Sequence, residues 1–343
     1  MEPNAQTALK TLSLKKALIP VVCGVIITGF IFYKSGKIKN EILTLVANPN
    51  WKYLSMAMFS IVLREAGHIY RLHLLSKNIL SWKSCFYIAI LWEFSSAVTP
   101  SVIGGGLVAI FIFSKEGLTL GRSLSYVIIN GILDNIFFLG AASRSFFGDF
   151  EPIFAMLGDL SSSIKVIFFT NYTILFIYTT IIATGVFINP KLLKWILMHV
   201  TSIGFLKRWR KKAYQMSKDI IITANGFRGR KPIFWVKILA CTVCTWIVRY
   251  GFLNLLIASY IPIPLSEHLI IFRKQIIIWT IMLIPLAPGG SGIAEISFQE
   301  LFSTTLGDYM LLILLLWRIC TFYLYLSIGA LFIPKWIKRV FKK

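Results

Sequence analysis

Acidic residues are scarce in this chain, and so are histidine and cysteine. Its 343 residues include 14 Asp and Glu against 36 Lys and Arg, with four histidines and five cysteines. Charged residues make up 15% of the chain and hydrophobic residues 57%, which is far more apolar than a soluble domain. This balance argues against an ordinary soluble enzyme and indicates a protein that crosses a membrane several times.

Familiar signatures of catalysis are missing as well. The histidines form no H-E-x-x-H motif, the stretch from Gly289 to Ile293 lacks the last glycine of a G-x-S-x-G elbow, and there is no Walker A sequence. Cys241 and Cys244 form a C-x-x-C inside an apolar segment, but no second Cys or His pair lies near them, which argues against a zinc site. We therefore predict no metal, no cofactor and no catalytic residue.

The formal net charge of +22 lies mostly in loops that flank apolar segments. This distribution favours anionic membrane lipid over nucleic acid as the partner of the charges. Lys10, Lys15 and Lys16 precede the first apolar stretch, which resembles a signal sequence but has no small-x-small cleavage site. We expect this stretch to remain as the first span.

Six apolar segments are near the length that a bilayer core requires of a helix. They are 17 to 33, 51 to 75, 123 to 142, 166 to 188, 233 to 257 and 309 to 333. Two further apolar regions, 84 to 113 and 269 to 303, are interrupted by proline and clustered glycine, which end helices. The predicted fold is one all-α membrane domain over 1 to 343, with six full transmembrane helices and two re-entrant hairpins. Hydropathy alone would count seven or eight spans.

Basic residues in the loops predict the orientation. The segment 188 to 232 holds eleven Lys and Arg and one acidic residue, and five more basic residues follow Pro334. By the positive-inside rule both are cytoplasmic, while 143 to 163 and 258 to 268 are external. This places both termini in the cytoplasm of a bacterium whose inner membrane holds the chain, although the basic loop after the first span disagrees with that arrangement.

The basic segment contains a second feature. Within 189 to 232, the run from Lys207 to Lys212 is followed by a helix-compatible mixture of basic and apolar residues. We expect an amphipathic helix on the anionic cytoplasmic leaflet, and the alternative is a solvated charged loop.

The two halves of the chain, 15 to 142 and 164 to 335, share a layout. Arg64 precedes Pro100 by 36 residues and Arg249 precedes Pro288 by 39. A further charge lies in the span after each break, Asp134 in the first half and Arg318 in the second. With the topology above the halves run in opposite directions, which predicts an inverted repeat with a substrate site between them. The alternative is that the two breaks coincide by chance.

Ionisable side chains inside membrane spans are costly and usually functional. The shortlist for this chain is Arg64, Glu65, Arg71, Glu93, Asp134, Arg249, Glu295 and Arg318. A guanidinium suits a lipid phosphate, so we predict a phosphate site among Arg64, Arg249 and Arg318. Asp134 either contacts substrate or neutralises Arg318 or Arg249, and Arg71 is expected to snorkel to the cytoplasmic interface.

The glycines at the two breaks add possible anion donors. Each glycine segment is expected to begin a short helix, whose free backbone N–H groups favour negative charge. These glycines are Gly104 and Gly105 at the first break and Gly289, Gly290 and Gly292 at the second. One turn into the second short helix, the Glu295 carboxylate would meet a cationic head group or an arginine. Glu93 completes the predicted substrate-binding set.

At this point the residues resemble a known family. The stretch from Ala287 to Glu295 is similar to the motif P-G-G-x-G-x-x-E of the membrane region of lysylphosphatidylglycerol synthases, also called the flippase-like domain of the multiple peptide resistance factor. The break after Thr99 and the pair Trp317 and Arg318 add to the resemblance, which covers roughly residues 15 to 335.

The resemblance implies a protein that moves aminoacylated or otherwise modified phospholipid between leaflets, with both hairpins facing a central cavity. Family synthases add a soluble aminoacyl-transferase domain that we do not expect here. Three hypotheses remain: a translocator of phospholipid or lipid-linked substrate, a membrane transferase that uses Glu93, Asp134 or Glu295 as acid or base, and a scaffold or subunit for a separately encoded transferase. The sequence also leaves a homodimer open.

Overall fold

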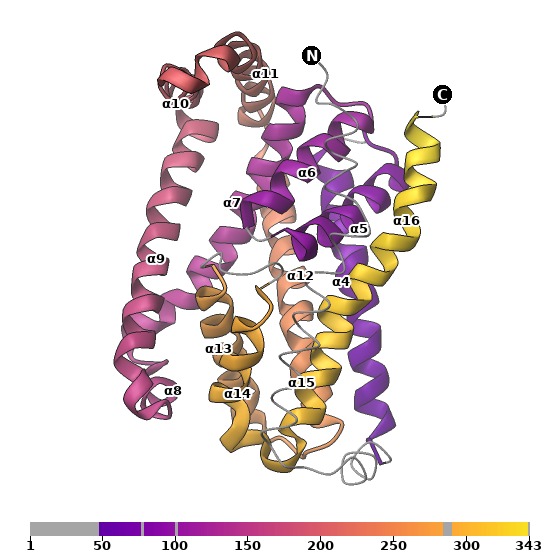
Figure 1. Cartoon of the computed structure of the whole chain (residues 1–343), viewed down its shortest axis with the longest axis vertical. Helices are drawn as coiled ribbons and strands as arrows, with labels where there is room; N and C mark the ends of the chain where they lie inside the picture. The colour runs from indigo at the N-terminus through magenta and orange to yellow at the C-terminus, as the bar shows by residue number, and fades with distance from the viewer. Residues whose placement is uncertain (1–47, 77–78, 100–101, 284–289, 342–343) are drawn as a thin grey trace.

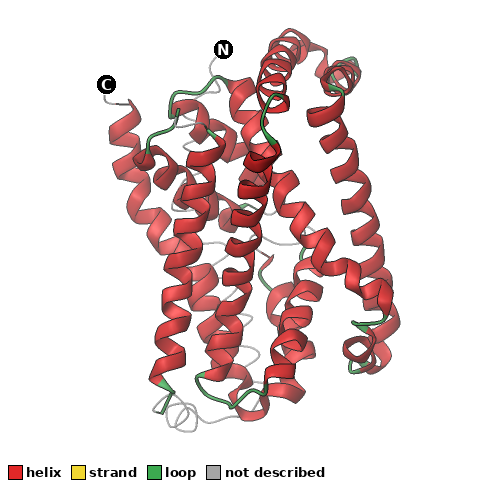
Figure 2. Cartoon of the chain, turned by 180° about the vertical axis from the view of Figure 1, so that it is seen from behind, coloured by secondary structure: helices red, strands yellow, loops and turns green. Residues whose placement is uncertain are grey.

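A computed structural model of the chain describes residues 48–76, 79–99, 102–283 and 290–341. The secondary structure in these ranges is helical, without a strand (Figure 2). Four helical stretches within them are long and apolar enough to cross a membrane, namely 120–147, 158–188, 232–258 and 293–341, and α4 (Trp51–Leu75) reaches the same length with more charge. The prediction of an all-α membrane protein is confirmed.

Helix boundaries follow local capping signals. Asn50 accepts a hydrogen bond from the backbone N–H of Lys52 at 3.2 Å and so begins α4. Ser81 caps α5 (Trp82–Val98) and Thr119 caps α7 (Leu120–Ser143) in the same way. Helix α5 ends two residues before Pro100, because a proline disfavours the helical conformation in the residue that precedes it.

The predicted spans match the observed helices closely, apart from the segment 17 to 33, which lies outside the described residues. The segments 51 to 75, 123 to 142 and 233 to 257 correspond to α4, α7 and α12 (Pro232–Ala258). The remaining two spans include non-α turns. One is α9 (Ser161–Ala183) with a π-helical end, and the other is α15 (Met310–Arg318), a π-helical turn, and α16 (Leu324–Phe341).

Both interrupted regions form helix pairs. The first pair is α5 and α6 (Val102–Lys115), and the second is α13 (Leu265–Ile281) and α14 (Ile293–Leu306). In Figure 1 the first pair lies in the upper half of the molecule and the second pair in the lower half. Helix α4 rises beside α12, which descends, and the backbone N–H of Asn50 bonds to the carbonyl of Ser259 at 2.6 Å. From α12 onward the described helices thus repeat the order of α4 to α7 in the opposite direction, while the boundaries of the two halves stay a prediction.

Basic helices gather at one end of the molecule. Helices α10 (Pro190–Val200) and α11 (Arg210–Arg228) lie at the top of Figure 1, as does the end of α16, whereas α8 (Glu151–Ala155) and the turn between α12 and α13 lie at the bottom. The two basic segments that the sequence assigns to one side therefore share an end. Which side of the membrane that end faces stays a prediction.

The hydrophobic core has two parts. One joins α5 and α6 to α7 and the end of α16, around residues such as Phe94 and Trp336. The other joins α13 and α14 to α15 and the end of α12, around residues such as Phe298 and Phe252. Each hairpin thus has a core of its own at its own end, and the middle of the molecule lies between the two cores.

Gly329 shows how tightly one hairpin is fixed. A Cβ placed on this α16 residue would overlap the side chain of Phe94, which is fully buried in α5. We expect Gly329→Ala to lower stability by about 1–3 kcal/mol, because the packed ring has no room to move. A fall in the midpoint of thermal unfolding in detergent measures this effect. Gly140→Ala in α7 is the matched control, since nothing lies within 4 Å of its added Cβ, and an equal fall in both variants would contradict the packing argument.

Candidate functional site

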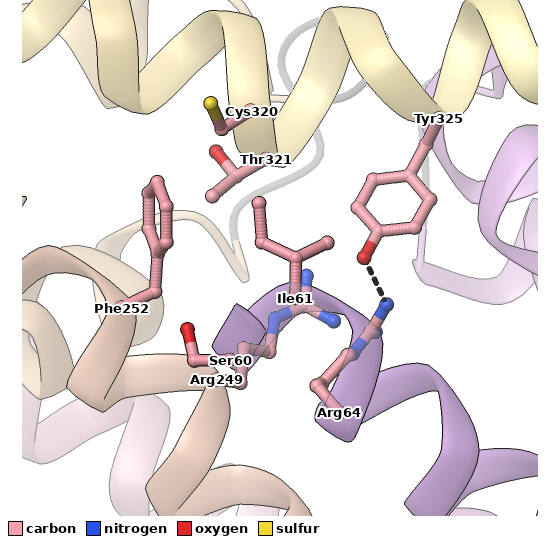
Figure 3. Close-up of a pocket in the computed structure, with 8 residues that line it drawn as sticks. All are labelled: Ser60, Ile61, Arg64, Arg249, Phe252, Cys320, Thr321 and Tyr325. Carbon is pink, nitrogen blue, oxygen red and sulfur yellow. Dashed lines mark hydrogen bonds between the residues drawn. The ribbon is translucent and has the colours of Figure 1, made fainter. Parts of the chain in front are cut away.

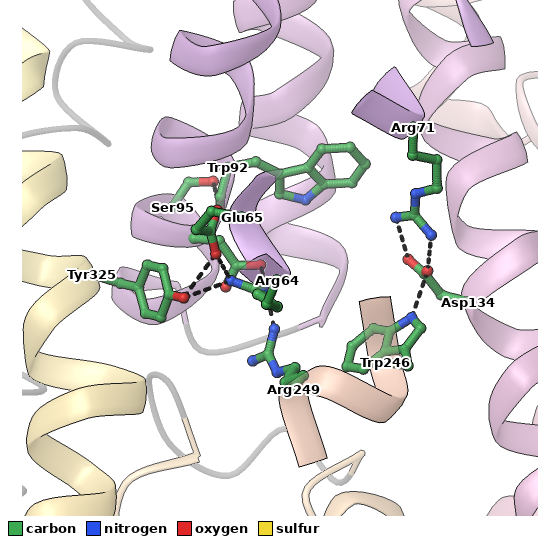
Figure 4. Close-up of polar contacts among 10 residues, drawn as sticks. Arg64, Glu65, Arg71, Trp92, Ser95, Asp134, Trp246, Arg249 and Tyr325 are labelled. Atoms are coloured by element: carbon green, nitrogen blue, oxygen red, sulfur yellow. Dashed lines mark hydrogen bonds and ion pairs between the residues drawn. The ribbon is translucent and has the colours of Figure 1, made fainter. Parts of the chain in front are cut away.

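Charged side chains meet at the middle of the molecule, between the two cores. Arg64 is near the centre of α4, about 20 Å along a helix that rises 1.5 Å per residue. It forms ion pairs with Glu65 of the same helix and with Glu93 of α5. It also donates to the Tyr325 hydroxyl of α16 at 2.8 Å, and that hydroxyl donates to Glu65 at 2.7 Å (Figure 4). We call these four residues and Arg249 the central arginine cluster.

Arg249 of α12 differs from Arg64 within this cluster. The Arg64 side chain is 6% exposed and has three partners, whereas that of Arg249 is 31% exposed and reaches Glu93 at 3.5 Å. The Arg249 guanidinium also lies 5.0 Å from the centre of the Trp246 ring. The two arginines and two glutamates of the cluster balance in charge. An anion that approached the cluster would have to displace Glu93 from one of the arginines, and Arg249 is the easier one because it has fewer partners than Arg64.

A pocket opens beside the cluster between α4, α12 and the π-helical turn. It is lined by Ser60, Ile61, Arg64, Arg249, Phe252, Cys320, Thr321 and Tyr325 (Figure 3). Its free volume is about 20 Å³, which suffices for a water molecule but not for a lipid head group. Any larger ligand therefore requires the surrounding helices to move apart.

The π-helical turn Ile319–Tyr323 contributes to this geometry. It supplies Cys320 and Thr321 to the pocket and lies between two buried polar side chains, those of Arg318 and Tyr325. A π turn adds a residue to one helical turn and so rotates the helix after the turn relative to the helix before it. Here it lets Arg318 reach the second hairpin while Tyr325 reaches Arg64.

Arg318 belongs to a second group, which we call the hairpin cluster. The Glu295 carboxylate, fully buried, lies 2.7 Å from Arg318 and accepts a hydrogen bond of 2.6 Å from the backbone N–H of Gly292. Arg318 also donates to the Ser291 hydroxyl at 3.3 Å and lies 4.2 Å from the centre of the Phe322 ring. The sequence allowed Glu295 to meet an arginine, and Arg318 is that arginine.

The glycines at the breaks occupy different roles. Gly292 has a φ of +91° at the start of α14, a conformation that glycine tolerates, but its N–H is already bonded to Glu295. Gly290 also has a positive φ of +66°. Gly104 and Gly105 lie in the first turns of α6, and an added Cβ on Gly105 would overlap Ser96 of α5, so Gly105 allows close helix packing. Gly289 lies outside the described residues.

Arg71 and Asp134 form a third group, and Arg71 lies two helical turns beyond Arg64 on α4. Arg71 is 3% exposed and pairs with the Asp134 carboxylate of α7, and it donates to Thr242 of α12 at 3.2 Å. The Trp246 ring N–H donates to Asp134 at 2.8 Å (Figure 4). The expectation that Arg71 snorkels to the interface is wrong, because this bonded carboxylate holds it in the interior. Asp134 neutralises Arg71 and neither Arg249 nor Arg318.

Sequence reasoning missed three residues of this interior. Tyr325 joins Arg64 to Glu65, and Trp246 connects the two groups on α4 by contacting both Arg249 and Asp134. Lys274 of α13 is 1% exposed and donates to Thr305 of α14 at 2.7 Å. Only Lys274 carried a signal, a charge within the interrupted region 269 to 303.

Comparison with known proteins now bears on this arrangement. Residues 18–329 match the model of the family described as lysylphosphatidylglycerol synthase TM region. The chain belongs to this family. It is also similar to a protein of Archaeoglobus fulgidus named UPF0104 membrane protein, with 27% identity over 336 residues that cover 92% of this chain and 95% of that one.

Two of the described residues that carried the resemblance to lysylphosphatidylglycerol synthase membrane regions, Glu295 and Arg318, meet in space. The stretch from Ala287 to Glu295 ends in the first turn of α14, and Trp317 and Arg318 end α15. The ion pair between Glu295 and Arg318 joins the two. In this family member Glu295 and Arg318 thus form one buried contact between a hairpin and a transmembrane helix.

Proposed function

We propose that this member of the family moves an anionic phospholipid, or an aminoacylated form of one, between the leaflets of its membrane. The head group would pass the central arginine cluster, with the acyl chains remaining in the bilayer. The observation that supports this most is the position of Arg249: a partly exposed guanidinium beside a pocket between the two halves, with one long contact to Glu93.

The chemistry of the pair suits such a head group. A phosphate diester that binds Arg249 through two N–H groups displaces Glu93, whose carboxylate then has a free lone pair. An amino group on the same head group compensates that carboxylate. The pair of Arg249 and Glu93 therefore matches a head group with a phosphate and an amino group that can donate to Glu93. It matches phosphatidylcholine poorly, because a quaternary ammonium has no N–H to donate.

The fold supplies elements that can open the closed pocket. Two hairpins enter from opposite ends, each with its own core, and α4 packs along α12 between them (Figure 1). In this proposal, sliding of one half against the other exposes Arg249 first toward one leaflet and then toward the other. The ion pairs of Arg64 and Arg71 stay intact and hold α4 to α5 and α7.

Leaflet exchange in proteoliposomes tests the proposal. Fluorescent phosphatidylglycerol and its lysyl form are placed in both leaflets, and a membrane-impermeant reductant bleaches the outer leaflet. We expect the protein to make the inner pool accessible faster than in empty vesicles, with the lysyl form fastest and a phosphatidylcholine probe slowest. Exchange no faster than in empty vesicles, with protein whose thermal transition shows it to be folded, overturns the proposal.

A further inference from the structure

A second hollow lies far from the central cluster, between α10 and α11 at the basic end. Its described lining is Met198, Lys207, Arg210, Lys211, Tyr214 and Gln215, and its volume is about 670 Å³. Three of these six residues are cationic and none is acidic. The hollow is large enough for a head group as the structure stands, unlike the pocket beside Arg249. We call it the α10–α11 pocket.

Two more cations lie beside the ring of Tyr214, which lines this pocket. The Lys194 ammonium of α10 lies 5.1 Å from the centre of the Tyr214 ring, and the Lys218 ammonium of α11 lies 4.7 Å from it. Together with the lining this places five cations around one hollow. Like charges at such spacing repel one another, and an anion in the hollow relieves that repulsion.

Helix α11, which forms one side of the pocket, packs against the helix bundle. On the face of α11 that meets the bundle, Ala224 and Phe227 are each 2% exposed, and the Phe227 ring lies 5.9 Å from that of Tyr126 in α7. Lys207, Arg210 and Lys211 therefore stand on a fixed support at the end of a membrane-spanning helix. Figure 1 shows both helices at that end.

Exposed apolar residues beside the pocket identify the source of the anion. Trp195 is 57% exposed, Ile203 55% and Trp209 47%, and all three lie on α10 or on the turn that joins it to α11. Tryptophan with neighbouring basic residues at the end of a span is typical of the membrane interface, where the ring sits at head-group level. A phosphate that approaches this pocket is thus one that lies in the bilayer surface.

We propose that the α10–α11 pocket binds the phosphate of an anionic phospholipid in the adjoining leaflet, at a site separate from the central arginine cluster. Lys207, Arg210 and Lys211 contact the phosphate, while Met198 and Tyr214 contact the glycerol and the first methylenes. The bound lipid fixes α10 and α11 on the membrane surface. This site does not depend on translocation by the central cluster.

Binding of short-chain phosphatidylglycerol to the full chain in a zwitterionic detergent tests this inference. Every protein in the comparison carries Arg249→Gln, so that the central cluster contributes little and failure of the transport proposal leaves the result interpretable. The test variant adds Lys207→Gln, Arg210→Gln and Lys211→Gln. The control adds Lys231→Gln, Lys335→Gln and Lys338→Gln, which removes the same charge from exposed residues of the same end.

We expect the dissociation constant to rise at least about tenfold in the test variant, as for loss of charge-assisted contacts, and to change little in the control. Inorganic phosphate and glycerol 3-phosphate should compete weakly, because neither fills the apolar side. An equal rise in both variants overturns the inference in favour of general surface charge. Tight binding of free phosphate, equal to that of the lipid, overturns it in favour of a soluble anion.

Discussion

Glu295→Ala is expected to destabilise the protein by about 3–5 kcal/mol, the cost of leaving a buried charge without its partner. The Glu295 carboxylate is fully buried and lies 2.7 Å from Arg318, whose side chain is 5% exposed. The same carboxylate bonds the N–H of Gly292 at the start of α14, so its loss also removes a helix cap worth about 1 kcal/mol. Thermal unfolding in detergent should show this as a large fall in midpoint.

The double variant Glu295→Gln with Arg318→Met is the matched test. Glutamine retains an acceptor for the Gly292 N–H, and methionine fills the space beside Phe322 without a charge. We expect most of the lost stability to return. A Glu295→Ala protein that unfolds at the wild-type midpoint would contradict a structural role, and loss of leaflet exchange in that same protein would assign Glu295 to transport.

The helices were predictable because their signals are local. The interval 51 to 75 was predicted and observed as α4, since a long apolar run follows Asn50, a residue that caps helices. The position of the first break was predictable for a similar reason, because Pro100 excludes a continuous helix. The π-helical turn at Ile319 to Tyr323 had no such signal, since no residue type there demands it.

The partners of the charges were less predictable than the charges themselves. Sequence reasoning selected Arg64, Arg249 and Arg318 as one phosphate site, but the first two lie in the central arginine cluster and the third is bound to Glu295. The neighbours at each height of α4 decide these contacts: Arg64 and Arg71 are two turns apart on nearly the same face, yet one pairs with α5 and the other with α7. Which helix lies at each height depends on the packing of the whole bundle, and no single segment encodes it.

Aromatic partners were invisible for a different reason. Phe, Trp and Tyr make up 15% of the chain, so an aromatic residue in a span carries little information by itself. Tyr325 and Trp246 became identifiable only through their hydrogen bonds to Glu65 and Asp134. Lys274 could have been found, because a lysine inside an interrupted apolar region is costly unless it is bonded or functional.

In the central arginine cluster, one substitution is expected to slow lipid transport without lowering the stability of the protein. Arg249→Gln is expected to slow leaflet exchange of phosphatidylglycerol by about 10- to 100-fold, as loss of a charge-assisted phosphate contact of about 1.5–3 kcal/mol implies. It should leave the thermal midpoint nearly unchanged, because Glu93 keeps its closer partner Arg64 and the Arg249 side chain is already 31% exposed. Fluorescent exchange and thermal unfolding on the same preparation measure both quantities.

Arg64→Gln should behave in the opposite way. It leaves Glu65 and Glu93 without the guanidinium that lies between them, so the midpoint of thermal unfolding should fall strongly. Any loss of leaflet exchange in this variant then follows from loss of the fold. Arg122→Gln removes one exposed positive charge from α7 and serves as the control for net charge. If Arg249→Gln exchanges lipid at the rate of Arg122→Gln, the head group does not pass Arg249. If it unfolds as readily as Arg64→Gln, Arg249 holds the helices together and its 3.5 Å contact with Glu93 is structural.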